Sequence, residues 1–390
     1  MKNDRKLILG ITTVSHMSVH SLMLIFPTIM LVLTYEFSTG LAMLGVIASL
    51  STFMFGLGAL PTGILEKKMG CSSLLMLYQF GTVISSLIIA SAQNLFVLTV
   101  GLILTGLFSS IYHPVGLTII SRNIDKISKG MAIHGIGGSF GLALGPLIAA
   151  VCTDTFSWRL AYITISILNF ILLIITFIFS KKWNIQTNHG IETEIPINET
   201  NKSALKYYFS ISVLMGFAFT GFTTYLPTHF AVETRTIFSS FSDTMRGGIF
   251  TTLVLLCGIF GQSMGGWAGE KYSISKYLFL IILFNIPFFI LLGLVSRYWL
   301  IGTALLLGII HFNWQPVGNS FIAKYTHSNQ RGLGYGINFF LNIGIGSIAA
   351  AVGGFIAEKY SVIYVFPVMG VVLTPALIFC WILIGKVDGK

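Results

Sequence analysis

The sequence predicts an all-α integral membrane protein in which twelve hydrophobic helices form two similar bundles of six. Three observations carry this prediction. Of the 390 residues, 54% are hydrophobic and only 9% are charged, whereas a soluble domain carries about 25% charged residues. The apolar residues fall into runs of roughly 20, the length that spans a bilayer. The first six runs and the last six share short motifs at a nearly constant spacing.

Each run is expected to be a helix, because a lipid-exposed backbone must satisfy its own hydrogen bonds. The first six runs cover residues 7–34, 41–65, 72–92, 95–121, 130–152 and 158–180. The last six cover 206–232, 247–268, 275–295, 298–323, 332–357 and 361–385. The first run is too long for the apolar region of a signal peptide, so we expect it to remain as a span.

The longest polar stretch of the chain, residues 181–205, separates the sixth run from the seventh. It is rich in Asn, Thr, Glu and Lys, a composition typical of a linker. The sequence therefore predicts an N-terminal bundle over 1–180, a cytoplasmic linker over 181–205 and a C-terminal bundle over 206–390.

The basic residues are distributed unevenly between the two ends of the predicted helices. All but five of the 23 Lys and Arg residues fall on one side; the exceptions are Arg159, Arg235, Arg246, Arg297 and Lys359. This positive-inside bias predicts a multi-pass protein of a bacterial inner membrane with both termini in the cytoplasm. The net charge of +10 is thus an orientation signal, and no nucleic-acid partner is expected.

The two halves repeat each other's motifs. Phe-Pro-Thr at 26–28 returns as Leu-Pro-Thr at 226–228, and His-Pro-Val-Gly at 113–116 returns as Gln-Pro-Val-Gly at 315–318. Gly63, followed by Glu66 and Lys67, matches Gly266, followed by Glu270 and Lys271. A parallel repeat of two six-helix halves resembles the major facilitator superfamily, and the resemblance implies the major facilitator fold with two pseudo-symmetric bundles.

Loop residues after the second and eighth runs extend this resemblance. In the superfamily the loop reads Gly, three residues, Asp, Arg, one residue and Gly. The second-half copy here fits with Glu270 and Lys271, and the first-half copy has its acid one place early, at Glu66 before Lys67. The resemblance implies that these four residues help to close the inner gate by binding neighbouring helix ends.

The fifth run contains Gly141, Gly145 and Pro146, which resemble the Gly-Pro motif of drug/proton antiporters. Small residues four apart let helices approach closely. The resemblance implies a gating role for these three residues and favours export. Ordinary packing of small residues is the alternative.

The chain also resembles the fosmidomycin resistance protein group. The shared residues are Ser15-His16 in the first run, Tyr112-His113-Pro114 in the fourth, and 137–138 (Gly-Gly) with 145–146 (Gly-Pro) in the fifth. This resemblance implies a monomeric secondary transporter that exports a small molecule by proton antiport.

The departures from that group fall on its charged residues. His20 stands where the group has an Asp in the first run. Val115 and Thr118 stand where the group has a Glu and an Arg in the fourth run.

Histidine is the ionisable residue type that remains inside the predicted membrane region. No Asp, Glu, Lys or Arg lies deep in a run, whereas His16, His20, His113, His134 and His311 do. Intramembrane ionisable residues are candidates for function, and histidine changes charge near neutral pH. We therefore expect any proton coupling to run through His20, with His16 and His113 beside it. The alternative is a set of separately satisfied histidines, which we favour for His134 and His311.

The first, fourth, seventh and tenth helices line the central cavity in the fold that this chain resembles. The substrate pathway is therefore expected to include His16, His20 and His113. The neutral polar candidates beside them are Tyr112, Tyr225, Asn313, Gln315 and Asn338, which can orient a ligand without a fixed charge.

These patterns predict a secondary active transporter that moves a small organic solute through the lipid bilayer by alternating access. No enzyme is expected, because no deep carboxylate accompanies a histidine. No cofactor is expected, and the four widely spaced cysteines predict no metal site or disulfide. The alternative is a transporter of a transition metal ion or metal chelate through a His- and Met-lined pathway, because imidazole and thioether ligands suit copper.

Overall fold

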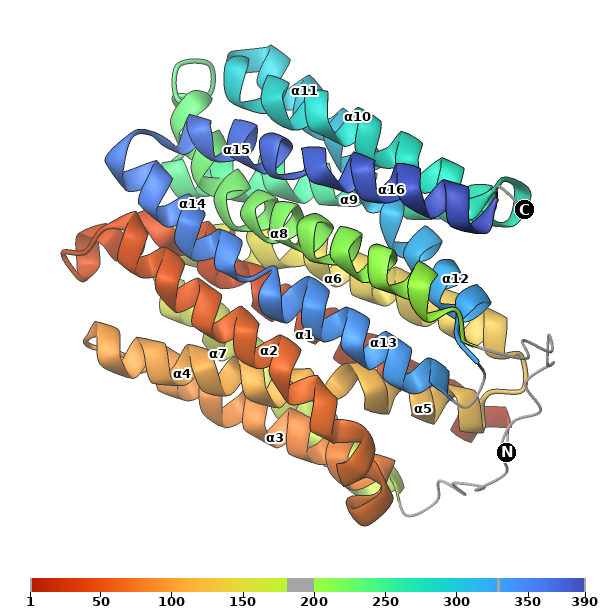
Figure 1. The fold of residues 1–390 in the computed structure, drawn as a ribbon. Helices are drawn as coiled ribbons and strands as arrows, with labels where there is room; N and C mark the ends of the chain where they lie inside the picture. The colour runs from red at the N-terminus through yellow and green to blue at the C-terminus, as the bar shows by residue number, and fades with distance from the viewer. Residues whose placement is uncertain (1, 181–199, 328–329, 389–390) are drawn as a thin grey trace.

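The computed structural model of the chain describes residues 2–180, 200–327 and 330–388. These residues form a bundle of long helices, and both ends of the chain lie on the same side of it (Figure 1). We call this side the terminal face and the other side the opposite face. Twelve helical segments of the described chain are long and apolar enough to cross a membrane. The prediction of an all-α membrane protein with twelve spans is confirmed.

The first half contains six spans built from seven helices. They are α1 (Lys2–Glu36), α2 (Leu41–Met69), α3 (Cys71–Ala90), α4 (Leu95–Ser110), α5 (Tyr112–Asn123), α6 (Ile127–Thr155) and α7 (Trp158–Phe179). The fourth span is divided between α4 and α5. Proline lacks an N–H group and its ring clashes with the carbonyl four residues earlier, so Pro114 explains why α4 ends at Ser110.

The second half repeats this plan with more interruptions. Its first spans are α8 (Lys202–Glu233), α9 (Asp243–Lys271), α10 (Ile274–Leu294), α11 (Arg297–Phe312) and α12 (Trp314–Tyr325). Pro316 divides α11 from α12 at the same relative position as Pro114 divides α4 from α5. The broken fourth and tenth spans are therefore structural counterparts, as the motif repeat predicts.

The last two spans are broken as well. The eleventh consists of α13 (Arg331–Phe339), a π-helical turn η3 (Phe340–Ile345) and α14 (Ile348–Lys359). The twelfth consists of a 3₁₀ turn η4 (Val362–Tyr364), α15 (Val365–Val372) and α16 (Thr374–Val387). The sequence analysis expected each of these spans to be a single run, and it contained no signal for the π-helical turn.

Most of the predicted linker, residues 181–199, lies outside the described residues. The end of the predicted linker is helical, since α8 begins at Lys202 and not at residue 206.

Large apolar side chains cover the outside of the bundle. Phe96, Phe177, Ile378 and Trp381 are each more than half exposed. An exposed apolar surface of this extent suits contact with lipid tails. The structure therefore accounts for the high hydrophobic content as a lipid-facing surface in addition to a buried core.

The two halves meet along two pairs of helices: α2 packs on α14, and α6 packs on α9. Glycine permits the closest approach of α2 to α14, because a Cβ at Gly45 would lie 2.4 Å from the backbone oxygen of Ala350. Near the terminal face, Ile64 of α2 and Trp267 of α9 are more than half exposed. The close contacts between the halves, as far as the chain is described, run from the opposite face to the middle of the bundle.

Candidate functional site

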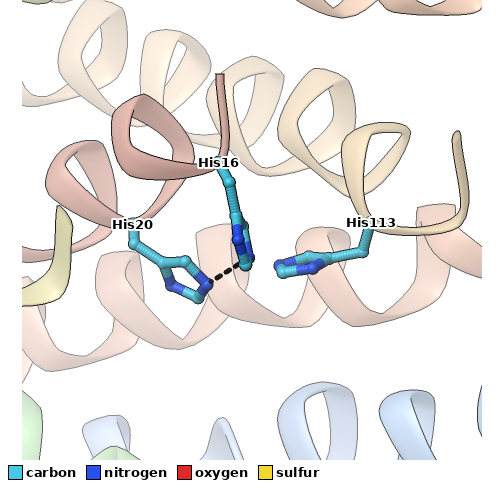
Figure 2. Close-up of side chains that lie close together, drawn as sticks. All are labelled: His16, His20 and His113. Carbon is cyan, nitrogen blue, oxygen red and sulfur yellow. Dashed lines mark hydrogen bonds between the residues drawn. The ribbon is translucent and has the colours of Figure 1, made fainter. Parts of the chain in front are cut away.

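Three histidine side chains from two helices converge inside the first half (Figure 2). His16 and His20 lie one turn apart on α1, and His113 lies in the first turn of α5. The ring centroid of His113 is 5.0 Å from that of His16 and 5.2 Å from that of His20. The break that Pro114 imposes on the fourth span sets the start of α5 at this depth. The structure thus brings together the three histidines that the sequence analysis assigned to proton coupling.

Hydrogen bonds fix the protons on two of these rings. His16 Nδ1 lies 2.8 Å from the backbone oxygen of His134, which can only accept, so His16 Nδ1 carries the proton and His16 Nε2 accepts. His20 Nε2 lies 3.1 Å from His16 Nε2 and therefore donates when both rings are neutral. This leaves a lone pair on His20 Nδ1, a buried atom without a hydrogen-bond partner in the described part of the chain.

His134 of α6 is a fourth member of the cluster, although the sequence analysis favoured a separately satisfied histidine at this position. Its ring stacks on His16 with a centroid distance of 4.0 Å and an interplanar angle of 10°. The approach depends on Gly138, where a Cβ would lie 2.3 Å from the His16 ring. The Gly-Gly pair at 137–138 was thus the only signal in the sequence for this contact.

Tyr112 supports the cluster from its buried position at the start of α5. Its hydroxyl donates to the backbone oxygen of Thr12 and lies 3.4 Å from His134 Nδ1. Its ring also stacks on His16 at 5.6 Å. These contacts let Tyr112 position His16 and His134, and its place in the substrate pathway stays a prediction.

The surroundings of the cluster are aromatic. His113 contacts Phe55 at 5.7 Å and Phe339, from the second half, at 5.3 Å between ring centroids. Within the described residues no carboxylate forms a hydrogen bond or ion pair with His16, His20, His113 or His134. A proton taken up here would be held by ring-to-ring hydrogen bonds and not by a salt bridge.

The same rings offer the donor atoms of a metal site. One imidazole nitrogen from each of His16, His20 and His113 lies within 4.8 Å of the others. Zinc binds imidazole nitrogen at about 2.0–2.1 Å, so a small contraction of the cluster would let three rings hold one ion. The cluster can therefore bind a proton or, as the alternative, a transition metal.

The other predicted pathway residues are dispersed over the second half. Tyr225 donates to the backbone oxygen of Ala350 (2.5 Å), Asn313 accepts from Tyr277 (2.8 Å), and Asn338 accepts from Ser212 (2.6 Å). These hydrogen bonds stay within the second half, although the Tyr225 hydroxyl also lies close to Gly45 of α2.

Gln315, the repeat partner of His113, belongs to a polar connection between the halves. Its side-chain oxygen accepts a hydrogen bond of 3.1 Å from Gln262 of α9. Gln262 in turn accepts a hydrogen bond of 2.6 Å from Ser139 of α6. The sequence analysis found Gln315 from the repeat but had no signal for Gln262 or Ser139.

The predicted inner-gate residues lie at the terminal face. Glu66 pairs with Arg122 at 2.7 Å inside the first half, and the Lys271 ammonium lies 4.9 Å above the ring of Trp267 on the same helix. Lys67 and Glu270 are exposed. In this conformation the described contacts of these residues do not cross between the halves.

Gly141 and Gly145 bring α6 against α1. A Cβ at Gly141 would lie 2.2 Å from the Met17 backbone oxygen, and one at Gly145 would lie 2.4 Å from that of Ser21. Pro146, by contrast, lies at the contact between the halves, where its backbone oxygen approaches Gly248 of α9. The packing role is therefore visible, and the gating role of these residues stays a prediction.

A cavity lies between the halves, beside the cluster and further toward the opposite face. Its walls come from α1, α2 and α4 of the first half and from α8 and η3 of the second, and Phe55 separates it from His113. The space between the walls, including the open mouth, is about 710 Å³. All polar side chains in the lining are Ser or Thr. Sequence reasoning missed them, because such hydroxyls commonly bond to their own helix.

Comparison with known proteins places this architecture among transporters. A family model described as Major Facilitator Superfamily matches residues 8–237. The fosmidomycin resistance protein of Escherichia coli (strain K12) is 24% identical over 275 residues, which cover 67% of this chain and 64% of the relative. The uncharacterized transporter YybO of Bacillus subtilis (strain 168) is 24% identical over 378 residues, which cover 88% of this chain and 86% of the relative.

Solved structures share the fold at low sequence identity. A peptide transporter POT in complex with sulfate matches with a TM-score of 0.80 at 14% identity. The match covers 98% of this chain and 94% of the POT chain. The nucleoside transporter NupG matches with a TM-score of 0.77 at 14% identity. The match covers 97% of this chain and 99% of the NupG chain. At this identity the likeness concerns the fold alone.

Proposed function

The chain belongs to the Major Facilitator Superfamily, and we propose that it exports a small organic solute across a bacterial inner membrane in exchange for protons. It is a multi-pass membrane transporter and not an enzyme, since the family match, the twelve spans and the transporter folds agree. The observation that carries the finer proposal is the histidine cluster beside the cavity, where His20 keeps a free basic nitrogen.

The proposed orientation has the terminal face in the cytoplasm, as the Lys and Arg bias predicts. The close contacts between the halves then lie toward the outside, and we propose that the solute reaches the cavity from the cytoplasm. Alternating access would separate the halves at the opposite face and bring them together at the terminal face. Glu66, Lys67, Glu270 and Lys271 lie where they would meet helix ends in that second state.

Export is the proposed direction of transport. The Gly-Pro motif of the fifth span resembles that of drug/proton antiporters. One relative is named for resistance to fosmidomycin, and export is a means by which a membrane transporter confers resistance. A chain that opens to the cytoplasm with an empty proton site is also in the state that loads an exported solute.

The proposed proton cycle uses His20 as the coupling group. In the described conformation His20 donates to His16 through Nε2 and leaves Nδ1 unprotonated. Outside, where protons are more concentrated, Nδ1 would take up a proton as the solute leaves. The proton would be released to the cytoplasm before the next solute binds. His16 fixes the orientation of His20, and His113 is the third ring within reach.

A proteoliposome assay tests this proposal. The parent, His20→Gln and His229→Gln would be reconstituted around a pH-sensitive dye and given a panel of drugs, nucleosides, phosphonates and Zn²⁺. We expect at least one organic solute to elicit proton flux in the parent and in His229→Gln but not in His20→Gln. His229 is a matched control, because it is buried and bonded to the Leu292 backbone oxygen and lies outside the cluster.

Two results would contradict the proposal. Equal solute-dependent proton flux in His20→Gln and the parent would remove His20 as the coupling group. A response of the parent to Zn²⁺ alone would support the metal alternative instead. That alternative is not favoured by the comparisons, whose proteins are named for fosmidomycin resistance, peptide transport and nucleoside transport.

A further inference from the structure

Two hydroxyl groups on α4 point to a ligand in the cavity. Thr105 and Ser109 lie one turn apart, line the cavity, and are only 7% and 2% exposed. Neither hydroxyl has a hydrogen-bond partner among the described residues. A helical Ser or Thr normally bonds to the backbone oxygen three or four residues earlier, as Thr99 does to Leu95 on the same helix. A buried polar group without a partner requires an explanation, and a bound solute supplies one.

A second pair faces the same cavity from the other half. Thr220 and Thr224 also lie one turn apart, on α8, and are 5% and 4% exposed. No hydrogen bond from either hydroxyl is present within the described residues. The cavity therefore carries one pair of available hydroxyls on each half of the molecule.

Apart from the hydroxyls of Ser51, Thr52 and Thr223, the rest of the lining is apolar. It includes Leu22, Met23, Phe26 and Leu102 of the first half and Phe219 of the second, with no Asp, Glu, Lys, Arg or His in the lining. Transfer of a charge from water into such surroundings without a partner is costly, whereas hydroxyls compensate an uncharged polar group. Such a lining favours an uncharged solute over a charged one.

We propose that this cavity binds a small uncharged solute whose hydrogen-bonding groups reach Thr105 and Ser109 at one end and Thr220 and Thr224 at the other, with an apolar portion between them. A solute held at both ends would contact both halves at once. Its binding would then favour closure of the halves around it, the step that alternating access requires. This inference rests on the proposed transport function and adds the class of solute.

Matched probes that differ only in charge test the class. Binding to the purified parent would be measured by isothermal titration calorimetry with N-acetylphenylalaninamide and uridine, and with their charged analogues N-acetylphenylalanine and uridine monophosphate. We expect an uncharged probe to bind at least about tenfold more tightly than its charged partner. The proposal is wrong if none of the four probes binds. It is also wrong if the charged probes bind more tightly than their uncharged partners.

Substitutions locate the binding. The double variant Thr105→Val with Ser109→Ala should weaken binding of the uncharged probe by about tenfold, because each hydroxyl contributes one hydrogen bond. Thr99→Val is the control, since its hydroxyl is already bonded to Leu95 and does not line the cavity. An unchanged affinity in the double variant, with thermal stability preserved, would move the binding site elsewhere.

The failure of this inference can be separated from the failure of the proposed function. If a charged probe elicits proton flux that depends on His20, the transport proposal stands and the solute class is wrong. If an uncharged probe binds through Thr105 and Ser109 without proton flux, the solute class stands and the coupling proposal is wrong.

Discussion

The two halves of this molecule share a fold but not a chemistry. By the register of the repeat, His16, His20, His113 and His134 of the first half correspond to Gly216, Thr220, Gln315 and Gly336 of the second. All four members of the cluster thus have uncharged counterparts. The repeat therefore builds the same frame twice, whereas the cluster of neighbouring histidines occurs in the first half only, among the described residues.

The space that His16 fills is closed differently in the second half. In the first half the His16 ring fits between α1 and α6 because Gly138 leaves room for it. In the second half Gly216 has no side chain, and the backbone of the π-helical turn η3 approaches it directly. A Cβ at Gly216 would lie 1.9 Å from the Asn342 backbone oxygen. One half therefore packs a side chain against a glycine, and the other packs a backbone against a glycine.

The first prediction breaks this arrangement in the second half. Gly216→Ala should destabilise the protein by about 3 kcal/mol, because its Cβ meets backbone atoms that cannot rotate away. We expect a large loss of monodisperse protein when heated samples are compared by size-exclusion chromatography. Gly302→Ala is the control, since a Cβ there meets nothing within 4 Å. Equal heat resistance of the two variants would mean that α8 and η3 are not packed as described.

The second prediction applies the same change to the first half. The three atoms nearest to a Cβ at Gly138 all belong to the His16 side chain, which can rotate away, so Gly138→Ala should fold normally. The movement would break the hydrogen bond from His16 to the His134 backbone oxygen. We expect solute-dependent proton flux to fall by up to about tenfold, the effect of one hydrogen bond. Gly135→Ala, with nothing within 4 Å, should keep the parent flux, and a normal flux in Gly138→Ala would contradict the role of His16.

The features that could be predicted from the sequence are those encoded by residues close together in the chain. Apolar runs located the spans, the motif repeat put Pro114 and Pro316 at corresponding positions, and the spacing of His16 and His20 put them on one face of a helix. His134 joined the cluster only through the close packing of α6 on α1, a tertiary contact for which a single sequence offers no pattern beyond a pair of glycines.

The cavity was beyond reach for a related reason. Thr105 and Ser109 look like any hydroxyls of a membrane helix, and only the absence of a backbone partner distinguishes them. The π-helical turn at η3 likewise depends on how α8 packs against it, and its sequence resembles that of an ordinary span.

At the opposite face the two halves are more alike than at the cluster. Glu358, in the last turn of α14, accepts a hydrogen bond of 2.8 Å from the backbone N–H of Ala42 in the first turn of α2. Asp154, in the last turn of α6, accepts one of 2.6 Å from Ser242, the N-cap of α9. Each half thus offers an acid to the start of a helix in the other half. These repeat-related contacts can hold the opposite face closed, since a carboxylate is favoured at a helix N-terminus.

The last prediction tests whether this likeness between the halves is functional. Glu358→Gln and Asp154→Asn should each shift the balance toward opening at the opposite face by about 2–5-fold, the effect of one charge at an exposed helix N-terminus. Spin labels at Phe96 of α4 and Trp299 of α11, on a background without the four native cysteines, would report the distance between the halves. We expect a longer-distance population that is small in the parent, larger in each single variant and largest in the double variant.

Glu233→Gln is the control, because this acid ends α8 at the same face and has no hydrogen bond or ion pair in the described structure. If it changes the distances as much as Glu358→Gln does, the shift reflects surface charge in general. If Asp154→Asn has no effect while Glu358→Gln does, only the contact made by Glu358 holds the opposite face closed. The two halves would then differ at this face as well as at the histidine cluster.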